Sequence, residues 1–399
     1  TLPAGCMGII EGSKIKIKKY WKLEINQNKK FDLEEFNYNF NQNINLHLRA
    51  DVPIAFTLSG GLDSSSIVKT SLENKNINYK AFSFNSEYEE ENDEKKFIDE
   101  FIKENSLNHS YVDCREGLNG DILEKILSLQ DEPINAVSFV NQFLLREHIH
   151  KQGYKVLLVG EGGDELLGGY NRMFIPFINS VYLNKNKPIP QILIDNIKKN
   201  LGSSFLNFKK NLDNYKDILN RNNDIEDLEV FNFLKIKESN LPSDLKFYND
   251  SKPDDENSFK KFLYCHLFKR DLPHILRLED RISMGNSIEN RTPFVDYKFM
   301  EYVFSLNEKY FMKDGFSKYM LRKIMNDKLP HKYLHKKKIG RPGSSKVMIF
   351  NNYYEKFCDY LNSFQNNIYF DPRLILDNLR NDKKNLKYRT NNDSYFRIL

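Results

Sequence analysis

The first stretch of the sequence that could perform chemistry is a short loop rich in glycine and serine, directly after an apolar run at 52–58. Adjacent glycines let backbone N–H groups close around phosphate oxygens, and a helix starting there adds unpaired N–H groups and a positive dipole end. A carboxylate in the loop could hold Mg²⁺ against those phosphates. The alternative is an ordinary strand-to-helix turn capped by Asp or Ser. The residues expected to form this phosphate-binding loop are Ser59, Gly60, Gly61, Asp63 and Ser64.

A second stretch, Gly160 to Tyr170, places three carboxylates among five glycines after the apolar run 155–159. Glycine costs conformational entropy and clustered like charges repel unless a cation intervenes, so a packing role is disfavoured. A metal site or an acid/base site is favoured. The alternative is a solvated turn in which Asp164 and Glu165 cap a helix.

Both loops follow apolar runs that are typical of buried strands. In an open α/β sheet, ligands gather beyond the carboxyl ends of the strands. We therefore expect Asp63 and Asp164 to share one Mg²⁺. The chain has no Gly-x-x-x-x-Gly-Lys-[Ser/Thr] motif, which disfavours an enzyme that cleaves the γ-phosphate.

The elements that must position these loops can be read from short apolar runs separated by helix-like segments. Runs of this length, bounded by glycine or polar clusters, are typical of parallel strands joined by crossover helices. The sequence therefore predicts an α/β fold with a parallel sheet and flanking helices. The runs lie at 52–58, 80–84, 110–112 and 155–159.

Three other regions differ in pattern. Residues 1–50 are rich in Lys and Asn, with a β-like piece at 14–19 and a helical pattern near 32–48, and we interpret them as an entry segment. Residues 182–260 predict a peripheral helical insertion. After Phe262 helical patterns dominate, so we expect the strands to lie early and a helical C-terminal layer to follow.

The composition limits the class of protein. The chain has 399 residues, 40% of them hydrophobic, which is enough for a sizeable core. No apolar run approaches the roughly 20 residues of a membrane-spanning helix, and no secretory signal is visible, so a cytoplasmic location is expected. The net charge of +5 is mild and demands no nucleic-acid partner. The four cysteines occur singly, without zinc-ligand spacing.

Together with two later segments, the two loops resemble the asparagine synthetases. One segment runs from Leu272 to Met284 and continues as Ser287–Asp296, and the other combines 315–322 with Lys338-Ile339-Gly340. All four motifs occur in the family's order over about 51–343. The resemblance implies a pyrophosphate-loop fold of the adenine-nucleotide α-hydrolase type, which cleaves ATP between its α and β phosphates.

The resemblance also implies residue roles. Asp63 and Asp164 would hold Mg²⁺ on the pyrophosphate, while Lys318 and Lys338 neutralise its charge. Glu161 matches the glutamate tied to forming and using the acyl-adenylate, as a candidate general base. Further positions match the polar wall around the substrate, Asp280 and Glu289, or line the nucleotide site, Leu58, Phe84, Val159 and Gly160.

The domain organisation expected from the resemblance is a linker and the remnant of the end of a glutaminase domain at 1–50, then an ATP-dependent synthetase domain at 51–399. Because the glutaminase body is missing from this sequence, we expect free ammonia, or a separate or removed glutaminase domain or subunit, to supply nitrogen. The other expected partner is a small-molecule carboxylate, and a homodimer is left open.

Departures from the asparagine synthetase pattern leave the acceptor open. Arg341 stands where these enzymes usually carry Phe, and Asn290-Arg291-Thr292 replaces a more apolar version. Aspartate is the leading acceptor, and relatives that amidate sugar acids or cyclise lasso peptides are alternatives. Glu161 argues against the β-lactam-forming branch, which has Tyr there. A tRNA-modifying ATPase of the same fold is a further alternative. Such an enzyme would need a strongly basic face or catalytic cysteines, and the sequence shows neither.

Overall fold

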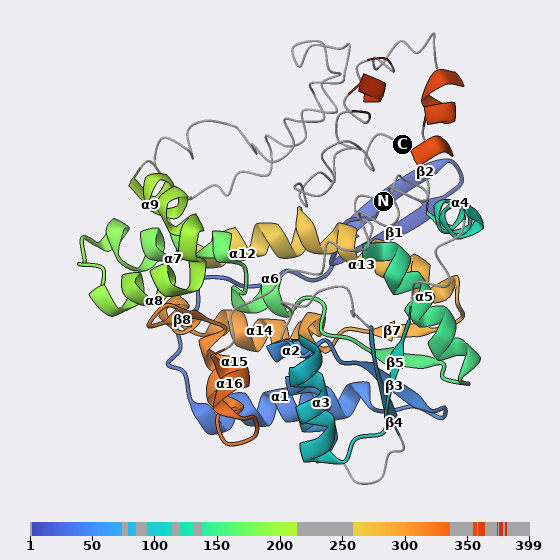
Figure 1. Cartoon of the computed structure of the whole chain (residues 1–399). Coiled ribbons are helices and arrows are strands. Elements are labelled where there is room, and N and C mark those ends of the chain that lie inside the picture. Colours follow the sequence, from blue (N-terminus) through green and yellow to red (C-terminus); the bar gives the residue numbers. More distant parts are fainter. Residues whose placement is uncertain are drawn as a thin grey trace.

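A parallel sheet organises the described part of the chain (Figure 1). It has five strands in the order β5-β4-β3-β6-β7. The computed structural model describes residues 2–73, 79–84, 94–113, 120–130, 138–213, 258–335, 354–356, 358–363, 373, 375–377 and 380. The predicted α/β fold is confirmed, because four strands fall on the four predicted apolar runs. They are β3 (Ile54–Thr57), β4 (Tyr79–Phe84), β5 (His109–Val112) and β6 (Val156–Leu158).

The fifth strand, β7 (Glu289–Arg291), corrects the expectation that all strands lie early in the chain. It pairs in parallel with β6, with Val156 opposite Glu289 and Leu158 opposite Arg291. The strand is short and lies at the edge of the sheet. Its sequence is Glu-Asn-Arg, so no apolar run predicts a strand there. Only tertiary pairing identifies this segment as a strand.

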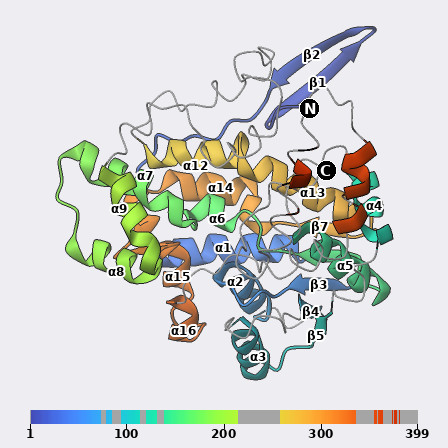
Figure 2. The same cartoon turned by 45° about the horizontal axis from the view of Figure 1, so that its top comes forward.

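Helices cover both faces of the sheet, and the alternation of side chains along each strand divides the core in two. On β3, Ile54 and Phe56 belong to one hydrophobic cluster, while Ala55 belongs to the other. The first cluster is shared with α1 (Leu33–His47), α2 (Leu62–Ser71) and α3 (Glu94–Asn105). The second is shared with α4 (Gly120–Leu129), α5 (Ser138–Lys151) and α13 (Asp271–Met284) (Figure 2).

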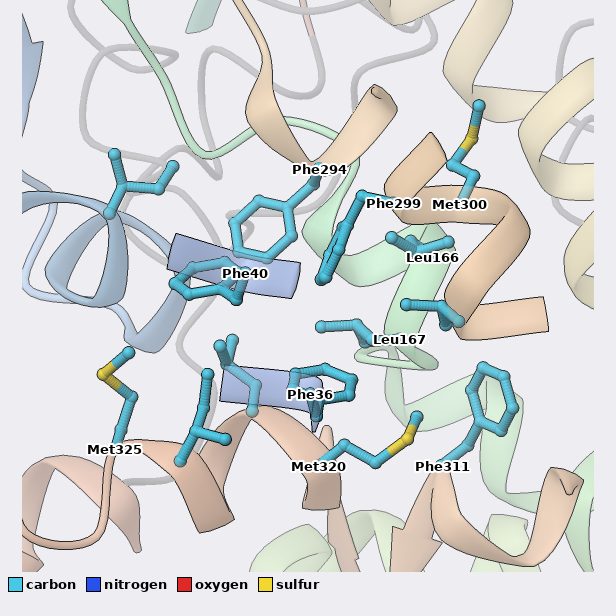
Figure 3. Close-up of a cluster of buried hydrophobic side chains, with 14 of the residues drawn as sticks. Phe36, Phe40, Leu166, Leu167, Phe294, Phe299, Met300, Phe311, Met320 and Met325 are labelled. Atoms are coloured by element: carbon cyan, nitrogen blue, oxygen red, sulfur yellow. The ribbon is translucent and has the colours of Figure 1, made fainter. Parts of the chain in front are cut away.

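Helix α1 falls inside the predicted entry segment, yet it packs in the centre of the first cluster. Asp32 caps it by accepting a hydrogen bond from the backbone N–H of Glu35 at 2.9 Å. The Phe40 ring lies 5.8 Å from that of Phe294 and 5.7 Å from that of Phe299, centroid to centroid (Figure 3). The domain boundary near residue 50 stays a prediction, while the helix before it is part of the packed body.

The rest of the described chain is mainly helical. Its part after Phe262 agrees with the expected helical C-terminal layer, apart from the short strands β7, β8 and β9. The predicted insertion at 182–260 is described only to residue 213 and again from 258, and the part between lies outside the described residues. Its described start is helical. The α-helices are α6 (Gly163–Leu167), α7 (Phe174–Val181), α8 (Gln191–Leu201), α9 (Phe205–Asp213), α12 (Phe259–Phe268), α14 (Tyr297–Ser305), α15 (Tyr319–Ile324) and α16 (His331–Leu334).

Shorter elements connect these helices. Two antiparallel hairpins pair β1 (Cys6–Glu11) with β2 (Lys14–Lys19) and β8 (Met312–Lys313) with β9 (Phe316–Ser317). Among the described helices, none combines the length and apolar character needed to cross a bilayer. The 3₁₀ turns are η1 (Asn171–Met173), η2 (Leu183–Lys185), η3 (Gly202–Ser204), η7 (Pro293–Val295) and η8 (Glu308–Tyr310).

The packing of α1 predicts a large effect of truncating Phe40. Its side chain is fully buried, so Phe40→Ala should lower the free energy of unfolding by about 3–5 kcal/mol. The matched control is Tyr38→Ala, because Tyr38 lies on the same helix and is 63% exposed. Urea unfolding followed by circular dichroism measures both. Equal small losses for the two variants would contradict the packing of α1 in the core.

Candidate active site

The loop between β3 and α2 is closed by hydrogen bonds between its serines. The Ser64 hydroxyl accepts from the backbone N–H of Ser59 at 3.1 Å and donates to the carbonyl of Gly61 at 3.2 Å. The Ser59 hydroxyl lies 3.0 Å from that of Ser64. Gly60 has φ +68°, a conformation that glycine adopts without steric cost. The predicted phosphate loop therefore forms a compact turn at the start of an ordinary α-helix.

The loop between β6 and α6 turns through Gly162, which has φ +86°. A Cβ at this position would lie 2.5 Å from Val295 Cγ2, so the loop also packs closely against η7. Of its three carboxylates, Glu165 turns inward and is buried, where it accepts a hydrogen bond from the Tyr170 hydroxyl. Burial raises the pKa of Glu165. Glu165 thus packs within the loop, and Glu161 is half-buried.

Lys318 joins the two loops. It lies directly before α15, and its Nζ contacts Asp164 Oδ1 at 2.6 Å and also binds the carboxylate of Asp63. The three side chains are 7%, 19% and 17% exposed, respectively. Burial acts to lower the pKa of Lys318, but the two carboxylates outweigh it and the pKa is raised. The ammonium therefore stays charged between two carboxylates from loops about 100 residues apart in sequence.

Two glycines of the second loop lie against this charged cluster. A Cβ on Gly169 would fall 1.8 Å from Asp164 Oδ1 and 2.3 Å from Lys318 Cε. A Cβ on Gly163 would fall 2.7 Å from Asp63 Cγ. The absence of side chains at these glycines lets the charged groups approach the backbone.

The two predicted metal ligands have the right chemistry for Mg²⁺. Asp63 and Asp164 present carboxylate oxygens toward one point that a cation, the Lys318 ammonium, already contacts. Mg²⁺ prefers oxygen ligands and is commonly held by one or two carboxylates together with substrate phosphates and water. Among the described residues, no cluster of three or more His, Cys, Asp or Glu could form a complete cage. The pair fits a metal whose remaining ligands come with the nucleotide.

The predicted nucleotide-lining residues come together at the carboxyl ends of adjacent strands. Leu58 follows β3, Phe84 ends β4, and Val159 with Gly160 follows β6. The backbone N–H of Leu58 donates to Phe82 at 2.9 Å, so this position continues the pairing of β3 with β4. The structure therefore brings these four residues to the same edge of the sheet as the two loops.

The predicted substrate wall is not joined to the charged cluster by any described contact. Glu289 lies at the amino end of β7, where its 60% exposed side chain accepts from Arg291 Nε at 2.7 Å. Asp280 is exposed on α13. Lys338 lies outside the described residues. The roles assigned to these three residues stay predictions.

Two supporting residues were missed from the sequence. Arg322 donates from Nε to the carbonyl of Ser317 at 2.6 Å and also binds the carbonyl of Leu334, which braces the turn that carries Lys318. Burial lowers the pKa of Arg322 to about 10. Its position four residues after Lys318, one turn along a helix, was the available signal.

His109 is the second missed residue, and it supports the nucleotide edge through Ser83. The Ser83 hydroxyl donates to the carbonyl of Leu58 at 2.5 Å. His109 Nε2 lies 2.8 Å from the same hydroxyl, so the imidazole must donate from Nε2. Burial lowers the pKa of His109 to about 4, with Lys80 adding to the effect and Asp99 opposing it. No sequence signal marks this chain of contacts.

Residues 35–396 match the asparagine synthase family. The chain belongs to this family. Asparagine synthetase [glutamine-hydrolyzing] 1 of Bacillus subtilis is 26% identical over 345 residues, which cover 83% of this chain and 52% of that protein. Amidase chyE of Penicillium rubens is 25% identical over 329 residues, which cover 70% and 49%. The chain thus spans about half the length of the curated relatives it matches.

Family membership confirms the resemblance found in the sequence. A solved structure of the U34-tRNA thiolase NcsA from Methanococcus maripaludis has a TM-score of 0.30 and 17% identity, covering 60% of this chain and 81% of that one. NH3-dependent NAD synthetase from Campylobacter jejuni has a TM-score of 0.27 and 11% identity, covering 58% and 96%. Likenesses this low carry no argument about function.

The buried imidazole predicts a pH dependence of stability. The pKa of His109 is lowered from 6.5 to about 4, so between these values the unfolded chain binds more protons than the folded one. Stability contributed by the neutral imidazole is therefore present above pH 6.5 and is lost as the pH falls toward 4. In His109→Phe the fall in unfolding free energy over this range should be shallower than in the wild type. Identical slopes in urea unfolding at pH 6.5 and 4.5 would contradict this.

Proposed function

We propose that this chain uses ATP to adenylate a small-molecule carboxylate, aspartate or a close analogue, and then transfers ammonia to it to form an amide. The observation that carries the proposal is the meeting of Asp63, Asp164 and Lys318 where two neighbouring parallel strands end. An enzyme that breaks the α–β anhydride must hold the departing pyrophosphate, and this cluster offers both metal ligands and a cation.

In the first step, an oxygen of the substrate carboxylate attacks the α-phosphorus and the bond to the β-phosphate oxygen breaks, releasing pyrophosphate. Negative charge builds on the leaving group, so fixed positive charge aimed at it lowers the barrier. Mg²⁺ held by Asp63 and Asp164 would supply Lewis-acid stabilisation there. The Lys318 and Lys338 ammonium groups would add counter-charge, and backbone N–H groups of the 59–64 loop would bind phosphate oxygens.

In the second step, ammonia attacks the acyl carbon and AMP leaves with the shared electron pair. The nitrogen must lose a proton, and Glu161 in the second loop would accept it. Glu161 is half-buried and lies in the loop that follows β6 at the carboxyl edge of the sheet. Asp280 and Glu289 would orient the acceptor from the neighbouring segments.

The acceptor is the open part of this proposal. Aspartate is favoured because several of the relatives are asparagine synthetases. Another relative is named an amidase, which is consistent with a different acceptor. A sugar acid, or the carboxylate of a peptide that becomes a macrolactam, would be activated by the same first step. The changes at Asn290-Arg291-Thr292 and Arg341 fall in motifs tied to the acceptor side.

The proposed organisation is a synthetase domain at 51–399 with a helical insertion at about 182–260, preceded by a linker and the remnant of a glutaminase domain at 1–50. A glutaminase domain or subunit would then deliver ammonia. Free ammonium salts should replace it in assays of this chain.

The central test supplies ATP, Mg²⁺, ammonium and a panel of carboxylates, and measures AMP. We expect AMP and pyrophosphate to appear with aspartate or another single carboxylate class, together with carboxylate-dependent exchange of labelled pyrophosphate into ATP. Asp63→Asn should abolish the exchange, because it removes a metal ligand. Asp51→Asn, which changes an exposed carboxylate just before β3, is the matched control. Release of ADP instead of AMP, or full exchange by Asp63→Asn, would refute the proposal.

Glu161 is tested by separating the two steps. Glu161→Ala should lower amide formation by about 10²-fold or more, the usual contribution of a positioned proton acceptor. Pyrophosphate exchange reports the first step alone and should fall less. Glu24→Ala, at an exposed position, serves as the control. Amide turnover equal to wild type would remove Glu161 from this role.

A further inference from the structure

The contacts of Lys318 have a consequence for metal binding. Its Nζ lies 2.6 Å from Asp164 Oδ1 and also contacts Asp63 Oδ2. Mg²⁺ bound between the same carboxylates would need oxygens at about 2.0–2.1 Å. Two cations cannot occupy one point between the same oxygens, because they overlap sterically and repel one another. The ammonium and the metal therefore compete for the two carboxylates.

The surrounding structure holds the ammonium in that place. Lys318 has φ +55°, a left-handed conformation that is unfavourable for a non-glycine residue and persists only where its surroundings enforce it. Arg322 fixes the preceding carbonyl of Ser317 at 2.6 Å. Gly169 leaves the space through which the lysine stem passes, since a Cβ there would meet Lys318 Cε at 2.3 Å. Three features therefore direct Lys318 toward the proposed metal position: its left-handed backbone, the hydrogen bond from Arg322, and the space left by Gly169.

We propose that Lys318 is an internal cation that occupies the magnesium position when nucleotide is absent. In that position it keeps divalent metal from the two carboxylates, and it is displaced when Mg²⁺ arrives bound to the triphosphate. The proposal rests on the metal assignment of the proposed function and adds an order of events: free metal does not enter first. The displaced ammonium is then released from its carboxylates while the polyphosphate supplies new negative charge.

The physical basis of this order is charge compensation. Without a cation, the partly buried Asp63 and Asp164 would repel each other and lose hydration, a cost that the ammonium offsets. Mg²⁺ without nucleotide must displace Lys318 from both carboxylates and must lose bound water. The loss of water is unfavourable for this ion. Mg²⁺ on ATP brings phosphate ligands and a new anionic partner for the lysine. The exchange then conserves ion pairing at every stage.

The test measures binding of Mn²⁺, a paramagnetic substitute for Mg²⁺, to nucleotide-free protein by electron paramagnetic resonance. Lys318→Met removes the competing charge while retaining an unbranched side chain. We expect it to bind one Mn²⁺ at least about tenfold more tightly than the wild type, because the ammonium no longer competes for the two carboxylates. The matched control, Lys323→Met, removes an exposed charge one turn further along α15 and should bind Mn²⁺ as the wild type does.

A further substitution assigns the metal to the two carboxylates. Adding Asp164→Asn to Lys318→Met should abolish the gain in Mn²⁺ affinity. Equal Mn²⁺ binding by folded wild type and Lys318→Met, or a gain that survives Asp164→Asn, would overturn the proposal. Near-ultraviolet circular dichroism checks that each variant is folded.

Lys318→Arg provides an independent measurement if the methionine variant does not fold. A guanidinium binds carboxylates through two parallel hydrogen bonds and should be harder to displace. The Mg²⁺ concentration needed for half-maximal binding of α,β-methylene-ATP should then rise at least about fivefold. An unchanged or lower requirement would overturn the proposal. These readouts are independent of turnover: loss of adenylation in the wild type would sink the proposed function, whereas unaltered metal competition would sink this inference alone.

Discussion

The pairing of one ammonium with two carboxylates is the interaction on which the site depends. Asp63 and Asp164 begin two different helices, and Lys318 reaches them from a turn 255 residues beyond the first. Each group is largely buried, and a buried charge is tolerated only when it is paired and hydrogen-bonded. The pairing ties the two loops to the C-terminal helical layer. It therefore links the parallel sheet to the part of the chain folded over it.

The sheet explains why the two loops are neighbours. Strands β3 and β6 pair directly and in parallel, although about 100 residues separate them, so the loops that follow them emerge side by side. Strand β7 then converts β6 from an edge into an interior strand, and its Arg291 carbonyl accepts the N–H of Val159 at 3.0 Å. This bond holds the beginning of the second loop in line with the sheet. A short polar strand thus helps to hold the 160–170 loop beside the 59–64 loop.

Much of the sheet could be predicted because buried parallel strands have continuous apolar runs in their sequences. Strand β7 could not be predicted, because its sequence Glu-Asn-Arg is polar and only its pairing with β6 makes it a strand. The two loops were found from glycine, serine and carboxylate spacing, but Lys318 entered only through resemblance, because no local pattern says that a lysine near the C-terminus meets Asp63. The inward turn of Glu165 and the contacts of His109 and Ser83 were equally hidden, since both are decided by packing between distant segments.

A site that holds a metal–polyphosphate complex, as proposed for this chain, must also be stable without that complex. Two carboxylates that converge on one point are favourable ligands in the loaded state and a source of repulsion in the empty one. Lys318 relieves that repulsion, and the bare backbone at Gly163 and Gly169 lets the charges approach closely enough for it to do so. The glycines of this loop therefore serve two purposes: Gly163 and Gly169 leave room for charged groups, while Gly162 and Gly168 allow close packing against Val295 and Phe259. Because the offsetting cation belongs to the chain, the proposed site would need no bound metal to hold the two loops together, and binding would then require less conformational ordering.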